Sequence, residues 1–141
     1  MRVGEVMTAH VEFVAGDATV CEAATLMGEL DVGALPVGSE ERLEGVVTDR
    51  DILYRVVARC LDPAQVRVSD VLSRPVIGCG ADDSVQAAMD LMAAHNVRRL
   101  AVRDAGGAVV GWVTLSDLAR RLLVGSDELQ GALRALSEEA A

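Results

Sequence analysis

The chain has 141 residues and a mass of 14.8 kDa, enough for one domain or for two small units that share a core. Its formal net charge of −9 argues against general nucleic-acid binding, because contacts to phosphates need a positive face. No run approaches the roughly 20 consecutive apolar residues of a membrane span. MRVGEVMTAHVEFV, at the start, lacks the apolar core of a signal peptide, so a cytoplasmic location is expected.

An internal repeat organises the chain. Residues 3–37 align without a gap with residues 68–102, and one extra residue then enters a polar loop. A repeat of about 60 residues buries too small a fraction of its surface to be stable alone. Two repeats packed together are therefore favoured. The identical pairs include Val6/Val71, Val11/Val76, Asp17/Asp82, Val20/Val85, Ala23/Ala88, Leu26/Leu91, Met27/Met92, Val32/Val97 and Leu35/Leu100.

The hydrophobic pattern predicts strand, helix, strand, strand and helix in each copy. The first copy comprises a strand at 11–14, a helix capped by Thr19 and ended by Asp31, strands at 34–37 and 43–48, and a helix with apolar Ile52, Leu53, Val56, Val57 and Cys60. The second comprises a strand at 76–79, a helix capped by Ser84 and ended by Asn96, strands at 98–102 and 108–114, and a helix with Leu118, Ala119, Leu122 and Leu123.

The predicted fold class is therefore α/β (or α+β), with two repeats related by a pseudo-twofold axis and packed sheet to sheet. LDPAQVR at 61–67 joins the repeats, and Pro63 marks the break. The expected domains are repeat 1 at 1–61, repeat 2 at 62–124, and a C-terminal helix or tail at 125–141. That last segment has Leu129, Ala132, Leu133 and Leu136 at helical spacing.

GVVTDRD at 45–51 and GWVTLSD at 111–117 share a glycine, a threonine three places on and an aspartate three places further. Thr-x-x-Asp before a helix is a capping box, which satisfies backbone donors at the helix start. The same residues also suit a ligand, because a helix N-terminus carries partial positive charge and a carboxylate accepts two hydrogen bonds from a ribose diol. The glycine would let another molecule approach the strand. We therefore expect two such sites in the cleft between the repeats.

The phrases DVGALPV, GVVTDRDI, VRRLAV and GWVTLSDL, in this order, resemble a tandem pair of cystathionine-β-synthase (CBS) domains, a Bateman module, over roughly residues 2–124. The likeness is to small stand-alone bacterial proteins. The resemblance implies a regulatory module that binds AMP, ADP, ATP, NAD or S-adenosylmethionine, with no other cofactor required. It also implies that Thr48 and Asp51 hold one ribose, and that Thr114 and Asp117 hold another.

Further site residues follow from the same resemblance. Gly33 and Ala34, with Arg98 and Arg99, would border the cleft, and Val46 and Trp112 would line the base pocket. Arg98 and Arg99 either contact phosphates or pair with surface acids, and Arg50 either reaches a phosphate or is solvated. Trp112 either packs in the core or enters the cleft on the same face as Thr114. If it enters the cleft, the Thr48/Asp51 site is the less obstructed one.

One departure from the family pattern is Ala101, which stands where the first copy has Pro36. We expect it to loosen the entry to its strand.

Other chemistry finds little support in the sequence. Cys21, Cys60 and Cys79 lack the spacing of a disulfide framework or a zinc site, and we expect buried small side chains. His10 and His95 stand alone, and no catalytic triad or carboxylate pair can be placed, so no enzyme and no metal site are expected.

The alternative to a nucleotide sensor is a ligand-free, dimeric protein-interaction module. A homodimer is expected in either case, because the stripe of Val20, Ala24, Met27 and Leu30 exceeds what one small sheet needs to cover. A regulated partner protein of unknown identity is also possible, whereas membrane and nucleic-acid partners are not expected.

Overall fold

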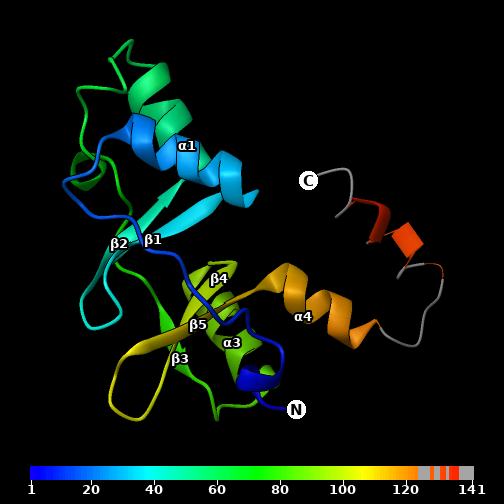
Figure 1. Cartoon of the computed structure of the whole chain (residues 1–141). Helices are drawn as coiled ribbons and strands as arrows, with labels where there is room; N and C mark the ends of the chain where they lie inside the picture. The colour runs from blue at the N-terminus through cyan, green and yellow to red at the C-terminus, as the bar shows by residue number, and fades with distance from the viewer. Residues whose placement is uncertain (124–127, 129–130, 133, 137–141) are drawn as a thin grey trace. The chain divides into compact units, whose positions relative to one another are not determined.

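The computed structural model describes residues 1–123, 128, 131, 132 and 134–136 (Figure 1). It confirms a mixed α/β fold with two small sheets and their helices. The chain forms two compact units. One is Val11–Val76, and the other combines Met1–His10 with the chain from Ile77 onward.

The unit formed by Val11–Val76 contains an antiparallel pair of strands and two helices. The strands are β1 (Ala34–Gly38) and β2 (Leu43–Thr48), with Leu35 opposite Val47. Helix α1 is Val20–Leu30, and α2 (Asp49–Ile52) continues into a π-helical turn at Leu53–Val57. A 3-10 turn at Val68–Asp70 follows. The fully buried side chains of this core are Val20, Ala23, Val37, Val47, Val56 and Val68.

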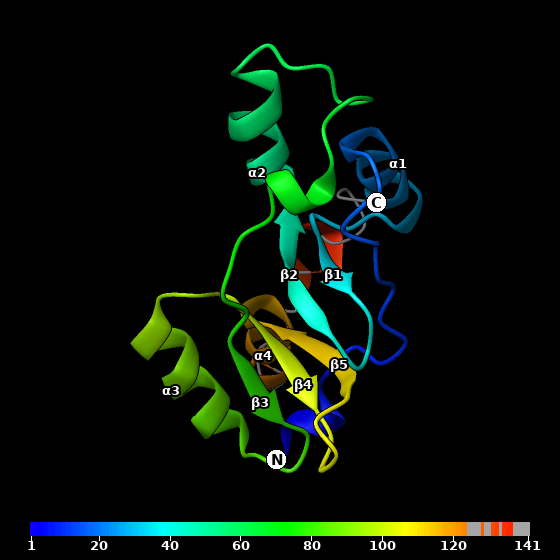
Figure 2. The ribbon, with the colours of Figure 1, turned by 90° about the vertical axis from the view of Figure 1, so that its left-hand side faces the viewer.

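The other unit contains a three-stranded sheet in the order β3-β4-β5 (Figure 2). Strand β3 (Gly78–Gly80) runs parallel to β4 (Arg99–Arg103), and β4 runs antiparallel to β5 (Val109–Thr114). The helices are α3 (Val85–His95), α4 (Leu115–Leu122) and a 3-10 turn at Val3–Glu5. The fully buried core side chains are Val3, Ala88, Leu100, Val102, Val113 and Leu118.

The predicted helix ends are confirmed in both units. The Thr19 hydroxyl accepts the Glu22 N–H at 3.1 Å, and Ser84 Oγ accepts the Ala87 N–H at 3.0 Å. Asp31 and Asn96 end α1 and α3 in the left-handed conformation, with φ of 55° and 52°. Residues 128, 131, 132 and 134–136 are helical. The rest of the expected C-terminal helix, including Leu129 and Leu133, lies outside the described residues.

The strand predicted at 11–14 is wrong, and the strand predicted at 76–79 is displaced to Gly78–Gly80. In the second repeat the Ala101 N–H donates to the Ile77 carbonyl at 3.1 Å, which extends the pairing of β3 with β4. Pro36 at the matching position has no N–H to donate, so the first repeat keeps only a bridge between Val14 and Val37. Ala101 therefore strengthens strand pairing instead of loosening it, contrary to the expectation.

The helix after the first motif also departs from the prediction. Val56 is fully buried, but Leu53, Val57 and Cys60 are exposed. The π-helical turn changes the register of the side chains, so residues spaced for an α-helix do not all face the core. Cys21 is exposed as well, because it follows Val20 by one position and points away from the buried face of α1.

Ala101→Pro should destabilise the protein by about 1–3 kcal/mol, because it removes a hydrogen bond to the Ile77 carbonyl. Urea unfolding followed by circular dichroism measures this difference. Pro36→Ala, the reverse change at the matching position, removes no hydrogen bond and serves as the control. An Ala101→Pro protein as stable as the wild type would contradict this account of β3.

Cys79 is the one predicted buried cysteine that the structure confirms. Burial raises the pKa of its thiol from 9.0 to about 11, and the negative charge of Asp83 adds to the shift. At pH 8 we expect Cys21 and Cys60 to react quickly with Ellman's reagent and Cys79 to react only after denaturation. A Cys79→Ala protein should lose only the slow thiol, and three fast thiols in the native wild type would contradict the prediction.

The raised pKa also sets a pH dependence. The folded state favours the neutral thiol, so the contribution of Cys79 to stability is complete below about pH 9 and is lost as the pH rises through about 11.

Candidate functional site

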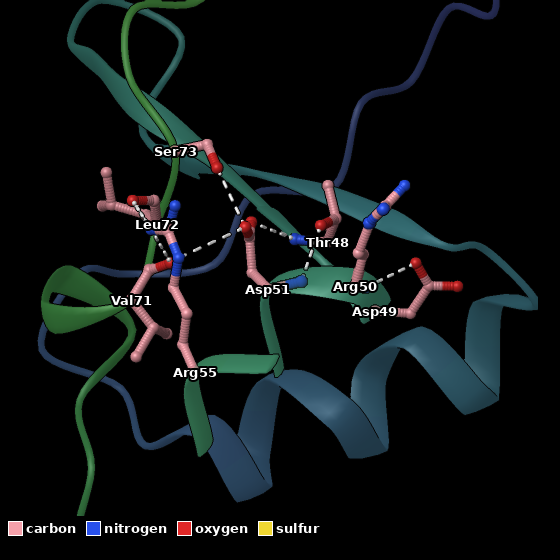
Figure 3. Close-up of polar contacts among 8 residues, drawn as sticks. All are labelled: Thr48, Asp49, Arg50, Asp51, Arg55, Val71, Leu72 and Ser73. Atoms are coloured by element: carbon pink, nitrogen blue, oxygen red, sulfur yellow. Dashed lines mark hydrogen bonds and ion pairs between the residues drawn. The ribbon is translucent and has the colours of Figure 1, made fainter. Parts of the chain in front are cut away.

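The first motif joins the end of β2 to the start of α2 (Figure 3). Thr48 caps the helix, and its hydroxyl accepts the Asp51 N–H at 3.0 Å. In return Asp51 Oδ2 accepts the Thr48 N–H at 3.0 Å. The capping box expected from the sequence is therefore present, with both of its hydrogen bonds.

The other carboxylate oxygen of Asp51 is engaged as well. Ser73 Oγ donates to Asp51 Oδ1 at 2.9 Å, and Arg55 Nε lies 3.9 Å from the same oxygen. Arg55 Nη1 in turn donates to the carbonyls of Val71 and Leu72, at 3.0 and 3.1 Å (Figure 3). Asp51 is only 8% exposed, and it is the one buried charged residue in the described part of the chain. Burial of this carboxylate is tolerated because both of its oxygens accept hydrogen bonds and an arginine lies beside it.

The second motif forms the same capping box between β5 and α4. Asp117 Oδ2 accepts the Thr114 N–H at 3.0 Å, and the Thr114 hydroxyl accepts the Asp117 N–H at 3.2 Å. Asp117 is half-buried. Within the described residues, no side chain donates a hydrogen bond to its Oδ1. Asp117 therefore has an oxygen without a side-chain donor, whereas the equivalent oxygen of Asp51 accepts from Ser73.

The glycines of the two motifs serve a different purpose from the one expected. A Cβ at Gly45 would lie 2.7 Å from the carbonyl oxygen of Ser73, and one at Gly111 would lie 2.9 Å from that of Thr8. These two segments pair with the strands next to the glycines, through bridges between Val46 and Ser73 and between Trp112 and Thr8. Part of the chain itself, within each unit, occupies the space that was expected to admit another molecule.

The predicted neighbours of the first motif lie close to it. Ala34 is opposite Thr48 in the β1–β2 pair, and the Gly33 carbonyl accepts the Asp49 N–H at 2.9 Å. A Cβ at Gly33 would lie 3.1 Å from an Asp49 carboxylate oxygen, so this carboxylate fills the space beside Gly33. Arg50 is exposed, and its guanidinium carbon lies 5.3 Å from the ring centre of Tyr54.

The corresponding residues of the second motif carry a different charge. Arg99 is opposite Thr114 in the β4–β5 pair, and the Arg98 carbonyl accepts the Leu115 N–H at 2.9 Å. The Arg98 side chain is exposed, whereas Arg99 is half-buried. Val46 and Trp112 are both half-buried, between residues that are buried, as strand alternation requires. Arg98 thus stands beside the second motif at the position where the first repeat has Gly33, and the space beside Gly33 is filled by the Asp49 carboxylate.

Sequence reasoning missed two residues that contact Asp51. Arg55 stands four places after Asp51, the spacing at which oppositely charged side chains meet on a helix, so it could have been found. Ser73 is 22 residues away in sequence, and only the repeat hinted at it, because the aligned residue, Thr8, is also a hydroxyl.

Two other features of the described residues bear on function. They contain no group of three or more His, Cys, Asp or Glu side chains placed to hold a metal ion. None of the helices they form has the length and apolar character needed to cross a bilayer.

The repeated strand–helix unit with its capped motif can now be compared with known proteins. The family model described as CBS domain matches residues 3–58 and again 68–124. The chain belongs to the CBS-domain family. Two CBS repeats in tandem account for both copies of the motif, which confirms the resemblance noted from the sequence.

Two relatives match most of this chain. The CBS domain-containing protein YhcV of Bacillus subtilis is 41% identical over 117 residues, covering 83% of this chain and 82% of its own. Hypoxic response protein 1 of Mycobacterium tuberculosis is 37% identical over 119 residues, covering 84% and 82%.

Solved structures agree with these sequence relations. A structure of Hypoxic Response Protein I with two coordinated zinc ions is 36% identical, has a TM-score of 0.74, and is matched over 85% of this chain and 98% of that one. A hexameric CBS-CP12 protein from bloom-forming cyanobacteria is 30% identical, has a TM-score of 0.73, and is matched over 92% and 73%. Oligomers therefore occur among relatives of this chain.

Proposed function

We propose that this CBS pair is a regulatory module that binds an adenosine nucleotide, with the ribose held by Thr114 and Asp117. The observation that carries the proposal is the carboxylate of Asp117, which has one oxygen in the capping box and one without a donor among the described residues. A ribose diol offers two hydroxyl donors in a geometry that a carboxylate accepts. The likeness to a family of adenosine-binding regulatory modules supports this choice of ligand.

The charges near the second motif favour a phosphorylated ligand. Arg98 is exposed, and its backbone is hydrogen-bonded to the first residue of α4. The start of α4 adds the partial positive charge of a helix N-terminus. AMP, ADP, ATP and NAD carry phosphates that such a guanidinium can bind, whereas S-adenosylmethionine carries none. We therefore place the nucleotides ahead of S-adenosylmethionine.

Asp117→Asn should weaken AMP binding about tenfold or more, because hydrogen bonds to a charged acceptor contribute about 1.5–3 kcal/mol. The asparagine oxygen can still accept the Thr114 N–H, so the helix cap is kept. Calorimetry measures the affinity, and Trp112, the only tryptophan, gives a fluorescence signal from the same strand face as Thr114.

Asp90→Asn, an exposed carboxylate change on α3, is the matched control for this experiment. Equal AMP affinities for the two variants would contradict the assignment. If AMP, ADP, ATP, NAD and S-adenosylmethionine all fail to raise the melting temperature of the wild type, the proposed function itself is wrong.

We also propose a homodimer, but one that uses a different surface from the stripe expected. Val20 and Met27 of that stripe belong to the core of their own unit, and only Ala24 and Leu30 are exposed. The π-helical turn instead offers three neighbouring exposed apolar side chains, Leu53, Tyr54 and Val57, which are 52%, 56% and 58% exposed. This turn is the observation that favours the alternative function, a ligand-free interaction module.

Leu53→Glu combined with Val57→Glu should convert the dimer to a monomer near 14.8 kDa, because a stable interface buries at least about 1,000 Å² and tolerates unpaired charge poorly. Light scattering at tens of micromolar gives the mass. Ala94→Glu, an exposed position on α3, tests whether any added charge has this effect. A wild-type protein that is already monomeric would refute the dimer.

A further inference from the structure

The two repeats carry the same polar side chains around their motifs but use them differently. Ser73 aligns with Thr8, and Arg55, four residues after the motif aspartate, aligns with Arg121. The backbone bridges also match, because the Ser73 N–H donates to the Val46 carbonyl at 2.8 Å and the Thr8 N–H donates to the Trp112 carbonyl at 2.8 Å. The repeats therefore differ in their side-chain contacts and not in this part of the backbone.

In the first repeat these side chains close around the carboxylate. Ser73 Oγ donates to Asp51 Oδ1, and Arg55 joins that oxygen to the carbonyls of Val71 and Leu72. In the second repeat, the described residues show no side-chain hydrogen bond from Thr8 or Arg121 to Asp117, and both of these side chains are exposed. Chemically similar side chains thus contact the motif carboxylate in the first repeat, and the described residues show no such polar contact in the second.

A ribose diol at Asp51 would have to compete with the Ser73 hydroxyl and with Arg55 for the same carboxylate oxygen. Asp51 Oδ2 accepts the Thr48 N–H and Oδ1 accepts the Ser73 hydroxyl, so both oxygens already have a donor, whereas no described side chain donates to Asp117 Oδ1. A phosphate near Gly33 would also meet a negative charge. Asp49 places its carboxylate beside Gly33, where the second repeat has Arg98.

We propose that Ser73 and Arg55 form a latch that keeps the first motif closed, so that each chain binds one adenosine nucleotide through Asp117. This inference rests on the proposed function of the second motif. Removing the Ser73 hydroxyl should free Asp51 Oδ1 and admit a second nucleotide. Ser73 is then the residue that sets how many ligands the CBS pair accepts.

Calorimetric titration with AMP tests the latch through stoichiometry. The wild type should bind one equivalent, and Asp117→Asn should lose it. Ser73→Ala should bind a second equivalent of AMP. Its affinity at Asp51 should be about tenfold higher than in the wild type, or more. The double variant Ser73→Ala with Asp51→Asn should not bind this second equivalent. Ser73→Thr keeps a hydroxyl and should stay at one equivalent, and Thr8→Ala, the matched change in the other repeat, should add none.

Two equal equivalents in the wild type, or one equivalent in the wild type with no gain in Ser73→Ala, would overturn the proposal. If AMP binds to Ser73→Ala but not to the wild type, the latch stands and the proposed function at Asp117 fails.

Hydrogen exchange tests the latch without any ligand. The Ser73 and Thr8 amides make equivalent backbone bonds, so the latch predicts slower exchange at Ser73 than at Thr8, and Ser73→Ala should abolish the difference. If AMP binds neither protein, this measurement decides alone: unequal rates that Ser73→Ala equalises support the latch, and equal rates in the wild type overturn it.

Discussion

Each unit depends on a short backbone pairing next to its motif. The segment at Ser73 pairs with β2, and the segment at Thr8 pairs with β5, each through two N–H to carbonyl bonds of 2.8 to 3.1 Å. The segments can approach this closely only because Gly45 and Gly111 have no side chain. The pairing satisfies backbone groups that would otherwise lie at a free sheet edge. It also brings a hydroxyl-bearing residue to the neighbourhood of each motif strand, and the different use of these hydroxyls separates the two repeats.

The capping box and the proposed ligand site use the same carboxylate without excluding each other. One oxygen of a carboxylate suffices for the cap, because the box needs a single acceptor for the N-cap N–H. The other oxygen can then accept from a further donor: at Asp51 this donor is Ser73, and at Asp117 no described side chain donates to it. Both Thr-x-x-Asp motifs of this chain therefore start a helix, and the residues around each one determine which further donors its carboxylate accepts.

Local patterns predicted much of the fold. The four hairpin strands, the caps at Thr19 and Ser84 and the left-handed stops at Asp31 and Asn96 follow from neighbours within four residues, and all are confirmed. The errors came from less local causes. A proline on the partner strand removed the strand at 11–14, and a π-helical turn turned Leu53 and Val57 toward solvent. At the site, both capping boxes were predictable from spacing, but the contact from Ser73 was not, because it depends on a chain segment 22 residues away.

The segments that make up each unit affect the order in which the two units can fold during synthesis. Val11–Val76 is continuous, so all of its contacts can form as soon as that stretch has left the ribosome. Met1–His10 instead belongs to the unit that continues from Ile77, and Thr8 bonds to Trp112, about a hundred residues later. Val3 and Gly4 bond to the carbonyls of Asp83 and Ala81, but Thr8 must wait for β5, the last strand of the described residues. Closing so long a loop is slow relative to local contacts, which makes the joining of Thr8 to β5 a natural late step in folding.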